Sequence, residues 1–208
     1  MLTVYGRASS MNVQAVMWGI AELGLTAERV DAGFGFGGTD TPEYRAMNPN
    51  GLVPVLRDEH VTMFESAAIL RYLAARFGRF PFWPEDPVAR APVDMWAEWG
   101  KVTLQANFLS AIFHPVLRGG APEPKGRAAL DSHLGILEAQ LAAGPWVLGE
   151  AFTLADIEVG LPLYRYFTLD LERRDWPRVA SYYRRLCDRP TFVEHVMIDY
   201  HHLAAMMR

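Results

Sequence analysis

The sequence predicts two domains, a small α/β domain over residues 1–78 and an all-helical domain over residues 88–208. Short runs of β-forming residues alternate with helical periodicity in the first third of the chain, whereas the remainder is helical almost throughout. Residues 79–87 separate the two patterns, and their three prolines without periodicity are typical of a linker. The length of 208 residues agrees with this organisation, since one domain takes ~150 residues.

The first domain is predicted to follow the order βαβ and then αββα. Its expected elements are strands at 2–5 and 28–31, helices at 10–23 and 42–47, a hairpin of 53–56 and 61–64, and a helix at 66–77. Gly24 ends the first helix. The helix that starts at Pro42 must be short, because the sequence NPNG at 48–51 is turn chemistry.

The second domain is predicted to contain only helices. Apolar periodicity places them at 88–117, 124–141, 154–166, 177–187 and 191–198. Thr153 and Asp156 have the spacing of a capping box at the start of one of these helices.

Composition excludes several classes of protein. The 20 basic and 24 acidic residues give a net charge of −4, and no basic cluster suggests nucleic-acid binding. The longest stretch without charged residues, 102–117, is too short and too polar to span a membrane. The single cysteine, Cys187, cannot form an internal disulfide or a cysteine metal cage, and no secretory signal is recognisable at the start. We therefore expect a cytoplasmic globular protein that binds no metal, nucleic acid or membrane.

One glycine-rich loop matches a nucleotide-binding pattern by spacing alone. Gly33, Gly35 and Gly38 fit GxGxxG, but that fingerprint requires a long helix directly after the third glycine. Only a short helix fits here. We instead expect a flexible loop in which Phe34 and Phe36 line a pocket. No hydrolase motif accompanies it.

The most informative polar residues lie where helices begin. Ser10 and Asn12 open the first helix directly after a strand and a tight connector, where the positive end of the helix favours anions. Glu65 and Ser66 open a later helix, and Val53-Pro54 follows a turn. An acid, a hydroxyl and free amides can together bind a zwitterion. Each feature also has a purely structural explanation, as a helix cap or a proline at the start of a strand.

Together these residues carry a resemblance to a known family. The motifs are SMNV at 10–13, NPNGLVPVL at 48–56, FESAAILRYL at 64–73, FTLADI at 152–157 and CDRP at 187–190. The chain resembles the cytosolic glutathione S-transferases, of a serine-type, bacterial-like kind, over nearly its whole length. The resemblance implies a thioredoxin-like first domain that binds glutathione and a helical second domain that contributes the electrophile pocket.

The resemblance also assigns the residues that bind glutathione. The backbone of Val53, before a cis Pro54, is expected to bind the cysteinyl part, and Glu65 and Ser66 the γ-glutamyl end. Leu52 belongs to the same segment, although its apolar side chain replaces the polar residue of some members. For the glycyl carboxylate the candidates are Arg7 and the backbone of the Gly33–Gly38 loop.

Ser10 matches the hydroxyl that faces the thiol in serine-type classes, and Asn12 is expected to assist it or to contact the sulfur itself. Tyr5 is a rival for this role, although its place inside a predicted strand favours a core position. The residues expected to line the electrophile pocket are Phe34, Phe36, Phe108, Ile112, Phe113 and His114.

The expected activity is attack of the glutathione thiolate on an apolar electrophile, typical of detoxification. Glutathione is then a co-substrate, no permanently bound cofactor is required, and the family resemblance implies a homodimer. Two alternatives stay open at this point. One is a glutathione-dependent disulfide reductase, dehalogenase or isomerase on the same fold, and the other is a non-catalytic module that binds a ligand or docks a partner.

Overall fold

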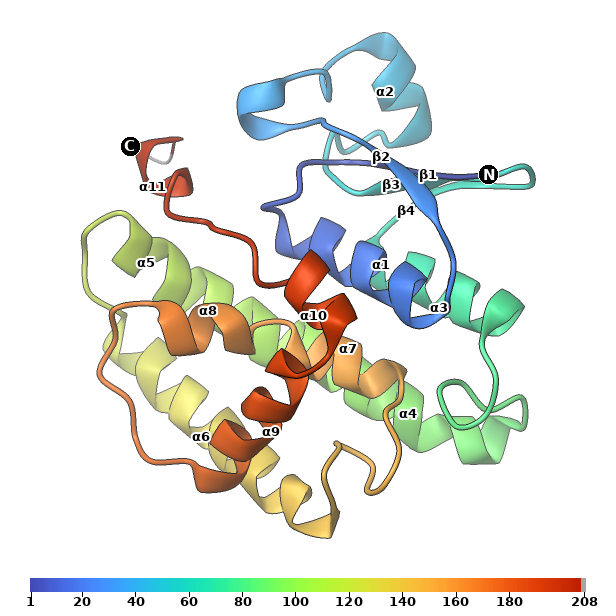
Figure 1. Ribbon diagram of the computed structural model, residues 1–208. Helices are drawn as coiled ribbons and strands as arrows, with labels where there is room; N and C mark the ends of the chain where they lie inside the picture. The colour runs from blue at the N-terminus through green and yellow to red at the C-terminus, as the bar shows by residue number, and fades with distance from the viewer. Residues whose placement is uncertain (207–208) are drawn as a thin grey trace.

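The amino-terminal part of the molecule is built on a mixed four-stranded sheet (Figure 1). The computed structural model describes residues 1–206. The strands are β1 (Leu2–Tyr5), β2 (Ala27–Val30), β3 (Val55–Arg57) and β4 (Thr62–Phe64), in the order β2-β1-β3-β4. Strand β1 runs parallel to β2 and antiparallel to β3, and β3 pairs antiparallel with β4. The two central strands β1 and β3 therefore join the βαβ half to the hairpin.

Helices cover both faces of this sheet (Figure 1). On one face lie α1 (Met11–Glu22) and α3 (Ser66–Phe77), and on the other lies α2 (Pro42–Met47). Alternation along the strands explains the two layers, since Val4 and Leu56 pack against α1 and α3 while Val55 packs against Tyr44 of α2. A short 3₁₀ turn, η1 (Phe34–Phe36), connects β2 to α2.

The remainder of the chain is helical and begins after the segment 78–86. Its elements are α4 (Pro87–Trp99), η2 (Gly100–Gln105), η3 (Phe108–Phe113), α5 (His114–Leu117), α6 (Pro124–Gln140), η4 (Leu141–Ala143), α7 (Leu154–Gly160), α8 (Leu163–Thr168), α9 (Pro177–Cys187), α10 (Pro190–His195) and α11 (Leu203–Met206). Within residues 1–206, no helix combines the length and apolar character needed to cross a membrane.

The predicted fold class is confirmed. The helical part differs from its predicted elements in several places: α10 ends at His195 rather than at residue 198, α11 was not predicted, and two longer helices are altered. The expected helix over 88–117 is one continuous rod, but its segments η2 and η3 are π-helical and therefore wider than an α-helix. The expected helix over 154–166 is divided into α7 and α8, because Pro162 at the junction lacks an N–H to donate.

Helix α1 joins the two parts of the molecule. Its face with Val13 and Val16 packs on the sheet, while Met11 and Trp18 belong to the core of the helical part. Trp18 is fully buried, and its ring meets the Phe192 ring edge-on at 5.0 Å. Because α1 is packed on both sides, its amino-terminal end is held at the boundary between the two parts.

Candidate active site

Ser10 occupies the position before the first turn of α1. It adopts the extended backbone of a helix cap, yet its side chain makes no capping hydrogen bond. Arg7 and Ser10 close a tight connector through the bond from Ser10 N to Arg7 O at 3.1 Å. The side chain is nevertheless only 7% exposed. The hydroxyl therefore remains available to a ligand at the positive end of the helix.

Asn12, two residues further along the chain in the first turn of α1, is oriented by residues of the helical part. Lys101 Nζ donates to Asn12 Oδ1 at 2.7 Å, and Gln105 Nε2 donates to the same oxygen at 3.1 Å. An ammonium group can only donate, so the atom that contacts it must be the carbonyl oxygen of the amide. The Nδ2 group of Asn12 is thereby left as a donor beside Ser10.

Lys101 also reaches the start of α3. Its ammonium donates to Ser66 Oγ at 2.9 Å, and Ser66 is almost fully buried. Because Ser66 accepts this bond, its own hydroxyl proton is free to point at a ligand. The preceding residue, Glu65, is exposed and has a left-handed φ of 69°. Such a conformation in a residue other than glycine costs about 1–3 kcal/mol and is common at ligand clamps.

A buried carboxylate lies behind Lys101. Glu158 of α7 is almost fully buried, and within residues 1–206 neither of its carboxylate oxygens has a hydrogen-bond partner. Burial raises the pKa of Glu158, while the charges of Lys101 and Arg71 act in the opposite direction. Helix α7 approaches this closely because Gly100 has no side chain, and a Cβ there would lie 2.8 Å from backbone atoms of Glu158 and Val159.

The turn before β3 forms one wall of the site. The Val53–Pro54 peptide bond is cis, as the resemblance implied. The carbonyl oxygen of Leu52 accepts hydrogen bonds from Tyr44 Oη at 2.9 Å and Asn48 Nδ2 at 2.8 Å, whereas its side chain is 64% exposed. Two buried polar groups thus hold the backbone of this turn.

Two adjoining cavities meet at the start of α1. The first, which we call the groove, is lined on its outer side by Gly33, Thr39 and the Gly51–Val53 turn. The second, which we call the pocket, has a volume of about 160 Å³ and lies against the helical part. The residues common to both are Arg7, Ser10, Asn12 and Phe34. A molecule in the groove and a molecule in the pocket would therefore meet beside Ser10 and Asn12.

The pocket wall carries positive charge. Arg165 of α8 is only 3% exposed, and its Nη2 donates to Ser9 O at 2.6 Å. Burial lowers the pKa of Arg165 to about 9, and the nearby charge of Arg7 adds to the lowering. Arg7 itself lies over the Phe34 ring at 4.6 Å. His114 also lines the pocket, and burial together with Arg118 and Arg165 lowers its pKa, which favours a neutral imidazole.

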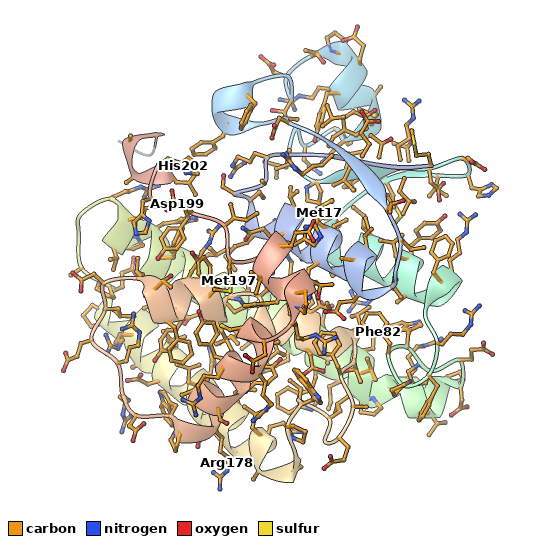
Figure 2. The ribbon with its side chains drawn as sticks, in the orientation of Figure 1. Met17, Phe82, Arg178, Met197, Asp199 and His202 are labelled. Carbon is orange, nitrogen blue, oxygen red and sulfur yellow. The ribbon has the colours of Figure 1, made fainter. Side chains whose placement is uncertain are left out.

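The carboxyl-terminal segment closes over this wall. Tyr200 is fully buried, and its hydroxyl lies 3.0 Å from Thr168 Oγ1. Figure 2 shows Asp199 and His202 together near α11, and His202 Nε2 lies 3.3 Å from Ser9 Oγ. The last helix therefore contributes Leu203 to the pocket.

Comparison with known proteins identifies the family. A family model described as "Glutathione S-transferase, N-terminal domain" matches residues 1–75, and one described as "Glutathione S-transferase, C-terminal domain" matches residues 104–185. Glutathione S-transferase GstB of Escherichia coli (strain K12) is 36% identical over 207 residues, which cover 95% of this chain and 99% of GstB. This chain belongs to the glutathione S-transferase family.

Solved structures agree with this family. The theta class glutathione S-transferase of Xanthomonas axonopodis pv. citri, with glutathione bound, matches with a TM-score of 0.85 at 36% identity, covering 95% of this chain and 98% of that one. A delta-class glutathione transferase of Nilaparvata lugens matches with a TM-score of 0.89 at 25% identity over the full length of both chains.

The structure brings most of the predicted site residues of this transferase together. Ser10, Asn12, Leu52 and Val53 line the groove, and Lys101 joins Asn12 to Ser66. Pro54 and Glu65 are the chain neighbours of Val53 and Ser66. Within residues 1–206, no three histidine, cysteine or acidic side chains converge in the manner of a metal site.

Some of the residues predicted to line an electrophile pocket line the pocket described above. These are Phe34, Phe113 and His114. Phe108 and Ile112 do not line it, and both side chains are fully buried in the core of the helical part. Phe36 also lies outside the pocket lining and is 61% exposed. Two further residues lie apart from both cavities: Tyr5 packs against the core around α2, and Cys187 is half-buried, with a pKa raised by burial.

Sequence reasoning missed three polar residues of the helical part, Lys101, Gln105 and Arg165. Lys101 and Gln105 stand 89 and 93 positions from Asn12, and Arg165 stands 156 positions from Ser9. Their separation gives no local signal. The sequence offers one feature that could have drawn attention to Lys101. It is one of two lysines in the chain, and no Asp, Glu, Lys or Arg follows it until after position 117.

Proposed function

We propose that this protein activates the thiol of glutathione at Ser10 and transfers the resulting thiolate to an electrophile in the adjoining pocket. Transferase activity agrees with the family and with the relatives above. The single observation that carries the proposal is the place of Ser10, whose hydroxyl does not cap α1 and lies where the groove meets the pocket.

Glutathione fits the groove in one direction. Its γ-glutamyl end lies at Glu65 and Ser66, where the Ser66 hydroxyl donates to the α-carboxylate and the Glu65 carboxylate accepts from the ammonium. Its cysteinyl backbone pairs with Val53, which places the sulfur at Ser10. Its glycyl carboxylate then lies on the side of Arg7, which lines the groove. In this arrangement, residues 1–78 bind glutathione, and residues 88–208 contribute to the electrophile pocket through Leu109, Phe113, His114, Arg165 and Leu203.

The energy needed to ionise the thiol is within reach of these groups. A free thiol has a pKa of ~8.5, and lowering it by about two units requires roughly 2.7 kcal/mol. One hydrogen bond from the Ser10 hydroxyl to the thiolate supplies roughly 1.5–3 kcal/mol, and the end of helix α1 adds about 0.3–1 kcal/mol. The Nδ2 group of Asn12 is a second donor. No further cofactor is required by this arithmetic.

A titration with glutathione tests the proposal directly. Binding is followed by heat release, and the thiolate by its ultraviolet absorbance across pH. We expect a bound thiol pKa below that of free glutathione in the wild type. In Ser10→Ala the pKa should rise by about one to two units, with kcat/KM at neutral pH falling about 10–100-fold. Ser110→Ala, which alters an exposed serine of η3, is the matched control. An unchanged thiol pKa in Ser10→Ala would remove Ser10 from the chemistry.

The alternatives have less support. Cys187 lines neither the groove nor the pocket, so disulfide reduction would have to use bound glutathione alone. A non-catalytic role predicts binding without a lowered thiol pKa. The family resemblance also supports a homodimer, and the single cysteine supports a reducing compartment such as the cytoplasm. A clean 23.4 kDa species in sedimentation at micromolar protein would contradict the dimer.

A further inference from the structure

Arg165 is an unusual residue to find in the wall of an electrophile pocket. Its guanidinium is buried and makes one hydrogen bond, from Nη2 to Ser9 O, while Nε has no partner within residues 1–206. Two aromatic faces flank it, since its Cζ lies 4.6 Å from the centre of the Phe113 ring and 5.4 Å from that of Tyr200. These contacts hold the group in place and leave its remaining donors for something else.

In the part of the chain that the structure describes, no acidic side chain of the pocket lining balances this charge. The groups with ionisable nitrogen in the pocket lining are Arg7, His114 and Arg165, and the lining contains no aspartate or glutamate among residues 1–206. Arg7 also has an unpartnered Nε. Buried charges in proteins are normally paired, because an isolated charge is costly to remove from water. An unpaired arginine in a ligand cavity therefore points to an anionic ligand.

The two carboxylates of glutathione do not account for Arg165. In the arrangement proposed above, one carboxylate lies at Ser66 and the other on the side of Arg7. Arg165 lines the pocket and does not line the groove. An anionic group that binds Arg165 would therefore belong to the second substrate, the electrophile.

We propose that the electrophile carries a carboxylate, which Arg165 binds while the reactive carbon faces the glutathione sulfur at Ser10. This inference rests on the transferase function proposed above. The remainder of the substrate is apolar and small, since the lining has an apolar part formed by Met11, Phe34, Leu109, Phe113 and Leu203. A cavity of about 160 Å³ is comparable with the ~150 Å³ cavity that holds benzene in another protein. A halogenated aromatic acid has the right combination of features.

The reaction is balanced without any further reactant. The thiolate attacks the halogen-bearing ring carbon, a carbon–sulfur bond forms, and halide leaves with the carbon–halogen electron pair. The proton of the glutathione thiol passes to solvent. The carboxylate of the substrate takes no part in bond making, so Arg165 acts on specificity and orientation.

The test compares two aryl halides of nearly equal size, 4-chloro-3-nitrobenzoate, which is an anion, and 4-chloro-3-nitrobenzamide, which is neutral. For each, kcat/KM is divided by the rate constant of the uncatalysed reaction with glutathione, which corrects for the different reactivity of the two rings. We expect this normalised value to be at least about tenfold larger for the benzoate, as a charge-assisted bidentate contact permits. A ratio of one or below would overturn the proposal.

Two variants test whether Arg165 causes the preference for the benzoate. In Arg165→Gln the ratio of the two normalised values should fall about tenfold. Arg173→Gln is the matched control, because Arg173 also donates to a backbone carbonyl, that of Tyr166, and lies over an aromatic ring but does not line the pocket. A ratio in Arg165→Gln equal to that of the wild type would mean that Arg165 only supports the Ser9–Ser10 connector.

Two further measurements keep the outcomes distinct. If Arg165→Gln does not fold, the affinities of the wild type for the two glutathione conjugates decide the matter, and equal affinities would overturn the proposal. Glutathione binding and the thiol pKa are recorded in parallel for every protein. If the wild type neither binds glutathione nor lowers its thiol pKa, the transferase function itself is contradicted. If the wild type does both but shows no preference for the benzoate, only the carboxylate site is contradicted.

Discussion

Replacement of Lys101 by methionine should weaken glutathione binding without removing any group that contacts the sulfur. Lys101 Nζ bridges Asn12 Oδ1 and Ser66 Oγ, at 2.7 and 2.9 Å, and so joins the starts of α1 and α3. Methionine preserves most of the apolar stem and removes the charge. Ser66 then loses the donor that leaves its hydroxyl proton free for the ligand, and Asn12 keeps only Gln105.

The magnitude follows from the two lost hydrogen bonds. A bond with a charged donor contributes about 1.5–3 kcal/mol, but Lys101 is only half-buried, and solvent reduces that value. Of the two bonds, the one to Ser66 acts directly on the γ-glutamyl end. We therefore expect a loss of about 1–2 kcal/mol in binding, which is a rise of roughly five- to thirtyfold in Kd.

Calorimetric titration at constant pH and salt measures this change. The ligands are glutathione and cysteinylglycine, which lacks the γ-glutamyl group. Lys101→Met should weaken the binding of glutathione and leave that of cysteinylglycine nearly unchanged. The other lysine of the chain, Lys125, is exposed in α6, so Lys125→Met serves as the control. A glutathione Kd within twofold of the control, in a protein that unfolds at the normal temperature, would refute the reasoning.

Three further predictions concern other charged groups. Arg7→Met should raise the Kd of glutathione about tenfold and that of its glycyl ethyl ester much less, because the ester has no glycyl carboxylate; equal effects on both would place that carboxylate elsewhere. Burial raises the pKa of Glu158 in the native state. Its favourable contribution to the free energy of unfolding is therefore present below the unfolded-state pKa of ~4.3 and is lost as pH rises through the native pKa. In urea unfolding from pH 4.5 to 9, Glu158→Gln should therefore lose less stability than the wild type, and parallel curves would contradict this. Asp156→Ala should lower the free energy of unfolding by about 3 kcal/mol, because Asp156 accepts from Val147 N, Thr153 N and the Tyr182 hydroxyl; a loss below about 1 kcal/mol would be inconsistent with that role.

Local chemistry was sufficient to predict many elements. The bounds of β1, α2, α3 and α9 agree with the sequence prediction at both ends. Proline begins α2 and α9, and glycine follows α3. Such signals act within a few residues, where backbone geometry depends little on the rest of the chain. The capping box of Thr153 and Asp156 is confirmed for the same reason.

Patterns of apolar residues were less informative about which side chains face a cavity. Phe108, Ile112 and Phe113 lie on one π-helical segment, yet only Phe113 reaches the pocket. Helical spacing identifies a buried face but does not distinguish a core from a cavity wall, since both remove apolar area from water. The extra residue per turn in η2 and η3 also rotates the side chains away from the positions that an ideal α-helix predicts.

The sequence by itself determined the fold class and the order of most elements, and it predicted a boundary near residues 79–87 and the half of the candidate site that begins at Ser10, Val53 and Glu65. These residues are recognisable because each one sits at a helix start or a turn, where its chemistry is tied to its neighbours in the chain. Only the tertiary structure decided the other half, in which Lys101 joins α1 to α3 and Arg165 lies in the pocket wall. The physical reason is that the partners and burial of a charged side chain depend on the residues packed around it. Helices far apart in the chain supply those residues.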